Sequence, residues 1–328
     1  MRQAIIEMLR SSGSDFLSGE EIADLLGISR AAVWKHIQKL RRTGYEIDSR
    51  ERCGYKFKNA PDILLASSVK EGLDTQIIGK EIHYFPSTDS TNCEAKILAY
   101  KKVPDGTVAV AEEQTGGKGR LNRSFYSPRG KGIWFSIVLR PNFVPSDAPK
   151  CTLMAAVSIA HAMERFGLRA QIKWPNDIMF DGRKLVGILT ELSAEMSRIT
   201  YIVLGIGINV NIAREEFPSE LRDLATSLME MKGERISRLE FFRAVLEEFD
   251  KLYVDISKDQ KHGFERMLDE WRHFNITLGK QVRVVTASTG EYFLGLARDI
   301  DSDGALLVET ADGIERVFAG DVSIREDK

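Results

Sequence analysis

The sequence predicts an α+β chain of three parts: a winged helix-turn-helix over residues 1–60, a central mixed α/β sheet domain over 61–275 and a small SH3-like β barrel over 276–328. Two helical patterns joined by a Gly-containing turn predict the first part. In the second part, Val- and Ile-rich runs of strand length alternate with helical patterns. Short apolar runs broken by turn residues predict the third part.

Composition and charge limit the class of protein. A chain of 328 residues allows two or three domains. Hydrophobic content of 43% and charged content of 29% are ordinary for a globular protein. The net charge is −2, yet residues 1–60 hold 11 Lys and Arg against 8 Asp and Glu, so a basic N-terminal part precedes an acidic body. This asymmetry favours a nucleic-acid partner for the first part alone.

The cysteines and histidines predict no metal site built from clustered protein ligands. Cys53, Cys93 and Cys151 are scattered and form no CxxC pair, which argues against a disulfide framework and for a reducing compartment. The five histidines show no ligand spacing. The first residues lack a signal-peptide core, and no apolar run approaches ~18 residues. We therefore expect a cytoplasmic protein that does not associate with a membrane.

The first part begins with helix signals. Ser18 and Glu21 have the spacing of a capping box, in which each side chain satisfies a free backbone amide. Gly27 ends that helix, and Ser29 caps the next one, SRAAVWKHIQKLRR. This second helix carries five cations and no acid. Such a helix after a short turn fits the major groove of DNA.

The stretch GYEIDSRERCGYKF predicts a two-stranded wing with a charged turn. A basic wing can contact DNA phosphates. The alternative is a small helical domain with a solvated basic face. The DNA-binding residues that we predict are Ser29, Arg30, Ala31, Ala32, Trp34, Lys35, Lys39, Arg42, Arg50 and Arg52.

The stretch NAPDILLASSVKEGL predicts a linker into the central domain. Beyond it, TVAVAEE, GIWFSIVLR, KLVGILTEL and ITYIVLGIGINV have strand composition, whereas APKCTLMAAVSIAHAMERFG and RLEFFRAVLEEFDKLYVDI have helical periodicity. This alternation predicts one sheet covered by helices.

Two glycine patterns fail the tests for known nucleotide motifs. In GIGINV, Val210 stands where a dinucleotide fingerprint needs its third glycine. In GGKGRLN, Asn122 stands at the position of that third glycine. The Gly-Lys-Ser/Thr ending of a phosphate-binding loop is also missing. A nucleotide bound by this chain would need a site of another design.

Four motifs of the central region indicate a ligand site. In STDSTNCEA, Ser90, Thr91 and Asn92 open a helix, where hydroxyls and amides can meet polar ligand groups, although a plain helix cap is the alternative. QTGGKGRLNRSFYSP combines glycines, which allow close backbone approach, with cations suited to phosphate. This stretch predicts a lid that becomes ordered over an anionic ligand.

The other two motifs come from the predicted strands. IKWPNDIMFDGRKLVGILTEL holds a rigid turn with Asn176 and Asp177, then a hairpin turn at Asp181 and Gly182, before Lys184 starts the next strand. In GIGINVN, Gly205 and Gly207 remove side chains from one strand face, so a flat ligand could lie against it.

Together these motifs resemble the biotin–protein ligases. The blocks KWPND, RKLVGILTE and GIGINVN follow an STN helix start and a Gly-basic-Gly-Arg loop, and the added winged helix resembles the bifunctional ligases that repress biotin operons. The resemblance covers the whole chain, and it implies the fold shared with class II aminoacyl-tRNA synthetases.

The resemblance implies a reaction in two steps. Biotin and MgATP give biotinyl-5′-adenylate, and a lysine of a biotin-carrier domain of acetyl-CoA carboxylase or pyruvate carboxylase then takes the biotin. It also implies that the adenylate is the corepressor and that the adenylate-bound form is a homodimer on operator DNA. The implied cofactors are ATP and Mg²⁺, with Asp177 as a possible metal contact.

The resemblance also implies a set of site residues. It implies Lys184 and Arg120 as catalytic residues. The implied biotin-binding set is Ser90, Thr91, Asn92, Gln114, Gly117, Lys118, Gly119, Arg120, Lys184, Gly187, Gly205 and Gly207. The implied adenylate or ATP set is Lys118, Arg120, Asn176, Asp177 and Asn209. Asn176 and Asp177 could orient Lys184, the ribose or a metal.

The chain departs from the family pattern in the loop. The family has Gly-Arg-Gly-Arg, and this chain has Lys118 in place of the first arginine. Lysine keeps the charge and loses the planar two-pronged donor. Phe125 stands where tryptophan is usual. We expect the lid to hold the adenylate less firmly than is normal in the family.

Two other functions stay open at the level of sequence. A lipoate or octanoyl ligase of related fold would share the adenylation chemistry, and a biotin-sensing transcription factor would bind biotin without catalysis. For the C-terminal barrel, a role in contacting the carrier protein is the alternative to a purely structural one.

Overall fold

The computed structural model describes residues 1–13, 15–42, 45–50, 53–59, 62–195, 198–286, 289–319 and 322–326. The chain forms two compact units, residues 1–62 and 63–328. Each is described by itself. Within the described residues, no helix is both long enough and apolar enough to cross a membrane.

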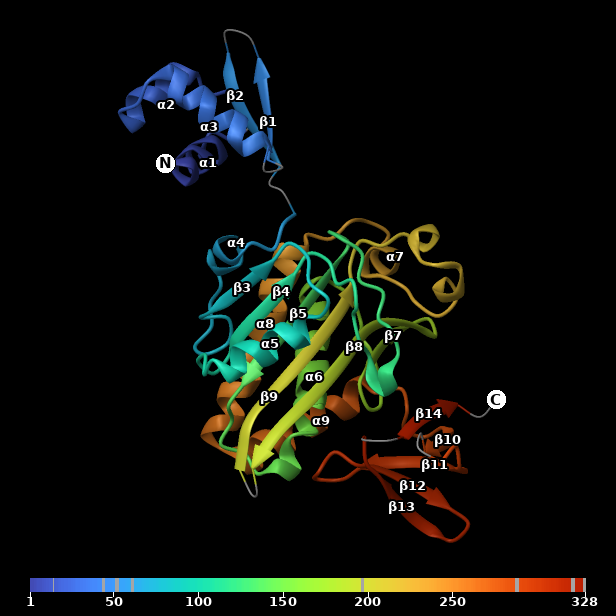
Figure 1. Cartoon of the computed structure of the whole chain (residues 1–328). Helices are drawn as coiled ribbons and strands as arrows, with labels where there is room; N and C mark the ends of the chain where they lie inside the picture. Colours follow the sequence, from blue (N-terminus) through green and yellow to red (C-terminus); the bar gives the residue numbers. More distant parts are fainter. Residues whose placement is uncertain are drawn as a thin grey trace. The chain divides into compact units, whose positions relative to one another are not determined.

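In its described residues, the first unit contains three helices and a two-stranded antiparallel wing, labelled in Figure 1. The capping box of Ser18 and Glu21 is present, Gly27 ends α2 in the left-handed conformation, and Ser29 accepts from the backbone N–H of Ala32. The helix signals predicted from sequence are therefore confirmed. The elements are α1 (Arg2–Ser11), α2 (Gly19–Leu26), α3 (Arg30–Arg42), β1 (Glu46–Arg50) and β2 (Gly54–Asn59).

Apolar residues at helical spacing make the core of this unit. Val33, Ile37 and Leu40 of α3 are buried against Ile5 and Leu9 of α1 in one cluster. Because these positions repeat every three or four residues, the opposite face of α3 remains in solvent.

The second unit is built on a seven-stranded sheet of order β3-β4-β5-β9-β8-β7-β6. Only β3 and β4 pair in parallel; the other neighbours are antiparallel. The strands are β3 (Ile82–Phe85), β4 (Thr107–Ala111), β5 (Gly132–Leu139), β6 (Gln171–Lys173), β7 (Asp177–Phe180), β8 (Arg183–Glu195) and β9 (Arg198–Asn209).

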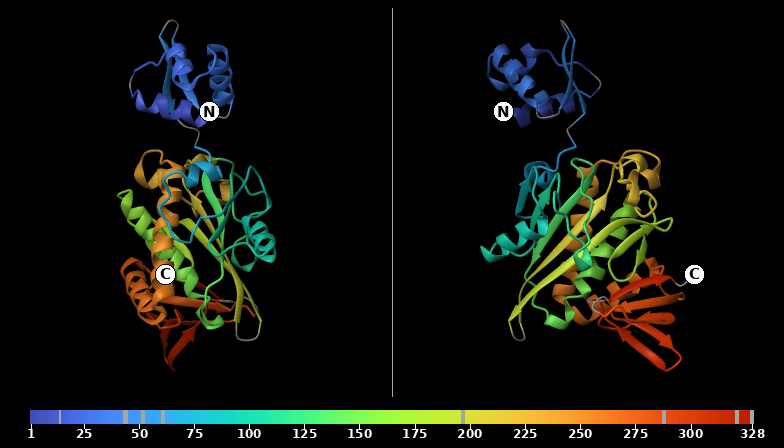
Figure 2. Two further views of the ribbon diagram at one scale, coloured as in Figure 1. Left: turned by 90° about the vertical axis from the view of Figure 1, so that its left-hand side faces the viewer. Right: turned by 45° about the vertical axis from the view of Figure 1, so that its right-hand side comes forward.

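Helices cover the two faces of this sheet unequally (Figures 1 and 2). One face buries Ile133, Phe135 and Leu204 in the main core, and the other packs Val138 and Val203 against α5. The helices of the main core are α6 (Lys150–Arg165), α8 (Arg238–Lys258) and α9 (Gln260–Phe274); α5 is Thr91–Tyr100, and two short helices are α4 (Ala66–Lys70) and α7 (Leu228–Lys232).

The stretch interpreted as a linker is shorter than the sequence predicted. α4 lies within it, and Leu64 and Val69 are buried in the main core. Leu64 also donates its backbone N–H to Glu112 over 2.8 Å. Apolar spacing in so short a helix gives too weak a periodic signal to separate it from a linker.

The C-terminal part is a five-stranded antiparallel sheet of order β13-β12-β11-β10-β14, as expected of an SH3-like domain. It packs onto the central sheet domain: the Trp174 indole donates to the carbonyl of Gly304, and Arg272 pairs with Asp299. The strands are β10 (Gln281–Thr286), β11 (Tyr292–Ile300), β12 (Leu306–Thr310), β13 (Gly313–Val317) and β14 (Val322–Glu326).

Candidate active site

A cavity of about 550 Å³ opens on the α5 side of the central sheet. The start of α5, the strands β7, β8 and β9, and the loop before β5 all contribute to it. Its polar and charged lining residues include Ser90, Thr91, Asn92, Gln114, Lys118, Arg120, Arg123, Lys173, Asn176, Asp177, Lys184 and Asn209. Segments more than 100 residues apart in sequence therefore meet at one site.

The glycine-rich loop forms one wall and is held by its own backbone. Phe125 donates its N–H to the carbonyl of Gly117 over 2.8 Å, and Gly119 donates to Arg123 over 2.7 Å. Arg120 links the loop to two other segments. It donates to Asn176 Oδ1 over 3.1 Å and also to the carbonyl of Ala319 in the C-terminal domain. Lys118 is exposed and lines the cavity.

Hydrogen-bonding groups at the start of α5 form a polar corner of the cavity. The side-chain oxygen of Gln114 accepts from the backbone N–H of Thr91 over 2.8 Å, while its amide nitrogen donates to Ser127. The Thr91 hydroxyl lies 2.8 Å from the Ser136 hydroxyl. A ligand head that carries both N–H and C=O groups fits such a corner, since donors and acceptors alternate there.

Lys184 and Asp177 face the cavity from neighbouring strands. A two-residue turn at Asp181 and Gly182, both with positive φ, joins β7 to β8 as the sequence predicted. The Lys184 Nζ lies 2.6 Å from Asp177 Oδ1. Both polar atoms of the Asn176 side chain are hydrogen-bonded. Its oxygen accepts from Arg120, and its amide nitrogen donates to the carbonyl of Ile188.

Protein side chains fill the space beside the glycines of the sheet, which the sequence did not predict. A Cβ on Gly205 would stand 1.9 Å from Asn92 Oδ1, and one on Gly207 would stand 2.5 Å from the Phe125 ring. A Cβ on Gly187 would also meet that ring, at 2.8 Å. Protein side chains therefore fill part of the space that these glycines leave, which we predicted a flat ligand could use; all three glycines line the cavity.

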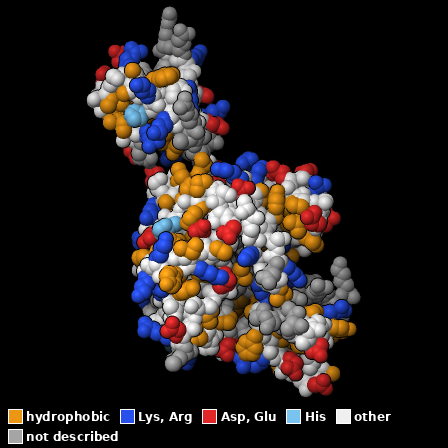
Figure 3. Space-filling view, in the orientation of Figure 1, with side chains coloured by type: hydrophobic (Ala, Val, Ile, Leu, Met, Phe, Trp, Pro, Cys, Tyr) orange, Lys and Arg blue, Asp and Glu red, His pale blue; other side chains and the backbone are white. Residues whose placement is uncertain are grey.

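Charge in the cavity is strongly one-sided. Five of its lining residues are cations, Lys118, Arg120, Arg123, Lys173 and Lys184, and its one acidic lining residue among the described residues is Asp177. On the face of the second unit seen in Figure 3, by contrast, basic and acidic side chains are interspersed. The cavity is therefore suited to an anionic ligand such as a phosphate ester.

The structure brings most of the predicted ligand-site residues together. All of them line the cavity except Gly117, which packs beside Phe125 and Gln114 within the loop. The sequence reading missed Lys173, Phe217, Leu221, Leu224 and Ala225, which also line the cavity. The last four belong to the segment 217–225, which reaches the cavity because the backbone N–H of Lys184 donates to the carbonyl of Leu224. No local motif predicts such a contact between segments far apart in the sequence.

The predicted DNA-binding residues lie in the first unit. Trp34 is 53% exposed, and Lys35, Lys39 and Arg50 are exposed as well. Arg30 stands 3.9 Å from Glu20, an exposed pair that contributes little stability. Ala31 is exposed, Ala32 is half-buried, and Ser29 is engaged in the helix cap. The Arg42 side chain and Arg52 lie outside the described residues.

A winged helix-turn-helix joined to a cavity of this kind defines the class of an adenylate-forming ligase with a DNA-binding domain. Three family models match the chain: a helix-turn-helix domain at 2–56, the biotin/lipoate A/B protein ligase family at 84–209, and the biotin protein ligase C terminal domain at 277–325.

Relatives extend these matches over the whole length. The bifunctional ligase/repressor BirA of Bacillus spizizenii is 41% identical over 99% of this chain and 98% of its own. The one from Escherichia coli is 28% identical over 96% and 94%. The biotin protein ligase of Aquifex aeolicus in complex with biotin and ATP superposes with a TM-score of 0.63 at 28% identity, covering 76% of this chain and all of that one. The chain belongs to the family of bifunctional biotin ligase/repressors.

Proposed function

We propose that the chain is an ATP-dependent biotin–protein ligase that also represses biotin operon genes when biotin is available. The observation that carries the ligase is the joining, in one cavity, of the polar corner at Thr91 and Gln114 with Lys184 and the basic loop. The corner suits the cyclic urea of biotin, and the cations suit an adenylate. Family membership supports both activities.

In the first step, a carboxylate oxygen of biotin bonds to the α-phosphorus of ATP, and the bond to the bridging oxygen of pyrophosphate breaks. Both reactants are anions, so catalysis depends on positioning and charge neutralisation. Lys184 lies between the two groups, and Asp177 orients it through the 2.6 Å ion pair. Lys118 and Arg120 close over the adenylate, while Asn176 and Asn209 contact its nucleotide part.

Mg²⁺ fits this site with ATP as its main ligand. Within the described residues, no group of three or more His, Cys, Asp or Glu forms a metal cluster, and Asp177 is the carboxylate that lines the cavity. Mg²⁺ commonly binds substrate phosphates together with one or two carboxylates. Bound there, the ion would neutralise the departing pyrophosphate.

In the second step, the amine of a carrier lysine attacks the carbonyl carbon of the mixed anhydride. The bond to the phosphate oxygen breaks, AMP leaves with the electron pair, and the nitrogen loses a proton as the amide forms. The acceptor is the biotin-carrier domain of acetyl-CoA carboxylase or pyruvate carboxylase. We assign DNA binding to residues 1–60, both chemical steps to 61–275 and assistance with the carrier to 276–328.

Repression follows from the same intermediate. We infer that the adenylate orders the loops of the central domain, which then pair two chains as a homodimer. A two-fold dimer matches the two half-sites of a palindromic operator. The adenylate shifts the population toward this dimer because it binds that form better.

The ligase is tested by supplying the purified chain with ATP, Mg²⁺ and biotin, and in parallel with lipoate. Pyrophosphate release with biotin, followed by AMP release and labelling of a carrier domain, is expected. Turnover with lipoate alone would make the chain a lipoate ligase, and no pyrophosphate or AMP with either acid would leave a sensor without catalysis. Sizing and operator binding, each with and without biotin and ATP, test the repressor.

A further inference from the structure

A continuous series of close polar contacts runs from the outer part of β8 to the polar corner of the cavity. Asn92 donates its amide nitrogen to Glu191 Oε2 over 2.8 Å, and its oxygen accepts from the Ser136 hydroxyl over 2.6 Å. The Ser136 oxygen lies 2.8 Å from the Thr91 hydroxyl, which lies 3.1 Å from Gln114 Oε1. Neither Ser136 nor Glu191 lines the cavity itself.

Strand register explains how these residues meet. Ser136 of β5 pairs with Gly205 of β9, and Gly205 pairs with Leu189 of β8. The Asn92 amide lies over Gly205, where a Cβ would stand 1.9 Å from its oxygen. Gly205 thus lets Asn92 reach from α5 to both flanking strands.

The carboxylate of Glu191 fixes the direction of each hydrogen bond from Asn92 to Thr91. A carboxylate only accepts, so Asn92 must turn its nitrogen to Glu191 and its oxygen to Ser136. That oxygen only accepts, so the single Ser136 proton is committed to it. The contact of 2.8 Å between the two hydroxyls then requires the proton of Thr91.

The contact between the Thr91 hydroxyl and Gln114 Oε1 is then left without a proton. At 3.1 Å it is also the longest of the three contacts between oxygens. The Thr91 proton therefore points into the protein, toward Ser136. Its lone pairs are left for the cavity, where Thr91 is a lining residue. Gln114 Oε1 remains satisfied by the Thr91 backbone N–H at 2.8 Å.

We propose that Ser136 is a positioning residue that, anchored through Asn92 to Glu191, holds the Thr91 hydroxyl as an acceptor for an N–H of the ligand head. This rests on the proposed function, in which the head is the cyclic urea of biotin, a group with two N–H donors. Ser136 is fully buried and acts through Thr91 without touching the ligand. Lys96 pairs with Glu191 over 2.6 Å at the partly exposed outer end, and this hydrogen bond raises the pKa of Lys96.

Ser136→Ala tests this role, with Ser158→Ala as its matched control. Ser158 is equally buried, and its hydroxyl bonds the Met154 carbonyl within α6, in the core on the other face of the sheet. In Ser136→Ala the Thr91 proton becomes free to turn toward Gln114 or the ligand. We expect the Kd for biotin, measured by calorimetry, and the KM for biotin to rise about tenfold. The KM for ATP should stay within about twofold, and the control should change neither constant by more than that.

A second pair of variants keeps the proposal testable if Ser136→Ala does not fold. Glu191→Gln lets the Asn92 amide turn either way, and a rise of about threefold in the Kd for biotin is expected. Lys96→Met removes the outer ion pair and keeps the Asn92 bond, so it should bind biotin like the parent. Unchanged biotin binding in Ser136→Ala, or in Glu191→Gln, overturns the proposal.

The parent protein separates this inference from the proposed function. A parent that binds biotin while Ser136→Ala binds it equally well contradicts only the role of Ser136. A parent that binds no biotin contradicts the proposed function and this inference together.

Discussion

Lys184 and Asp177 form an ion pair across the β7–β8 hairpin, with Nζ 2.6 Å from Oδ1. Lys184 also lies near the Phe125 ring, 6.0 Å from its centre, so the lysine is held between an acid and the glycine-rich loop. In the proposed reaction, this arrangement holds the cation where the two anions meet.

Lys184→Met should lower the rate of adenylate formation by about 100-fold or more, because it removes charge that stabilises the transition state. Asp177→Asn should lower it less, by about tenfold, since the lysine stays and loses only its orientation. Pyrophosphate release in single turnovers measures both. Lys173→Met, which removes another cation of the cavity, is the control; an equal loss there would mean that only total charge matters.

Lys118→Arg should slow the release of biotinyl-adenylate by about three- to tenfold, because a guanidinium can bind the phosphate with two hydrogen bonds. Lys118 is exposed, so the longer side chain meets no packing barrier. Dissociation of preformed adenylate gives the rate. An off-rate equal to that of the parent would contradict the idea that this lysine weakens the lid.

Lys35→Ala should weaken duplex DNA binding and lower the slope of log affinity against log salt by about one, as loss of one phosphate contact does. Ligase activity should be unchanged. Lys101→Ala makes the same charge change at an exposed site of the other unit and should leave DNA binding as in the parent. Loss of ligation in Lys35→Ala would contradict the division of labour between the units.

Glu112 and Arg238 form a buried pair 2.9 Å long at the base of the glycine-rich loop, with side chains 5% and 1% exposed. Glu112→Gln removes a countercharge of the buried guanidinium and should cost up to about 3 kcal/mol of unfolding free energy. Denaturant titration measures this. Asp255→Asn, which breaks an exposed pair with Arg266, should cost less than about 0.5 kcal/mol; equal costs would mean that burial is not the cause.

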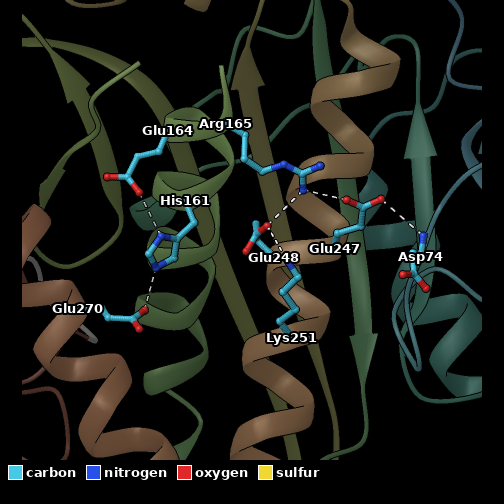
Figure 4. A network of polar contacts seen from close by, with 8 residues as sticks. All are labelled: Asp74, His161, Glu164, Arg165, Glu247, Glu248, Lys251 and Glu270. Carbon is cyan, nitrogen blue, oxygen red and sulfur yellow. Dashed lines mark hydrogen bonds and ion pairs between the residues drawn. The ribbon is translucent and has the colours of Figure 1, made fainter. Parts of the chain in front are cut away.

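His161 of α6 lies between Glu164 and Glu270, with Arg165, Glu247 and Glu248 forming a neighbouring network (Figure 4). The hydrogen bond that the His161 ring donates to Glu270 raises the pKa of His161 above its usual 6.5. The folded state thus holds this proton more tightly than the unfolded chain. Its contribution to stability is complete below pH 6.5 and is lost as the pH rises through the folded pKa.

The variant Glu270→Gln tests that pH dependence. The difference in melting temperature between parent and variant should be largest near pH 6 and should shrink toward pH 8.5, as thermal denaturation in a pH series can show. His161→Gln should give the same trend. A difference that is constant across the series would contradict titration of His161.

The sequence by itself determined the local devices and the class of protein. Ser18 and Ser29 begin helices and Gly27 ends one, as predicted, and the turn at Asp181 and Gly182 joins β7 to β8. These features could be predicted because capping and turn geometry depend on residues a few positions apart. The motifs around Lys184 and the glycine-rich loop, each contiguous in sequence, were sufficient to predict residues that line one cavity.

Tertiary structure decided what those motifs contact. That Asn92 fills the space over Gly205, that Glu191 and Ser136 hold it there, and that Leu224 reaches the cavity all depend on strand register and on segments far apart in the chain. A glycine in a strand looks the same in sequence whether a ligand or a side chain takes its place. Only the packing of α5 on the sheet distinguishes the two, because contact across elements leaves no periodic signal in either segment.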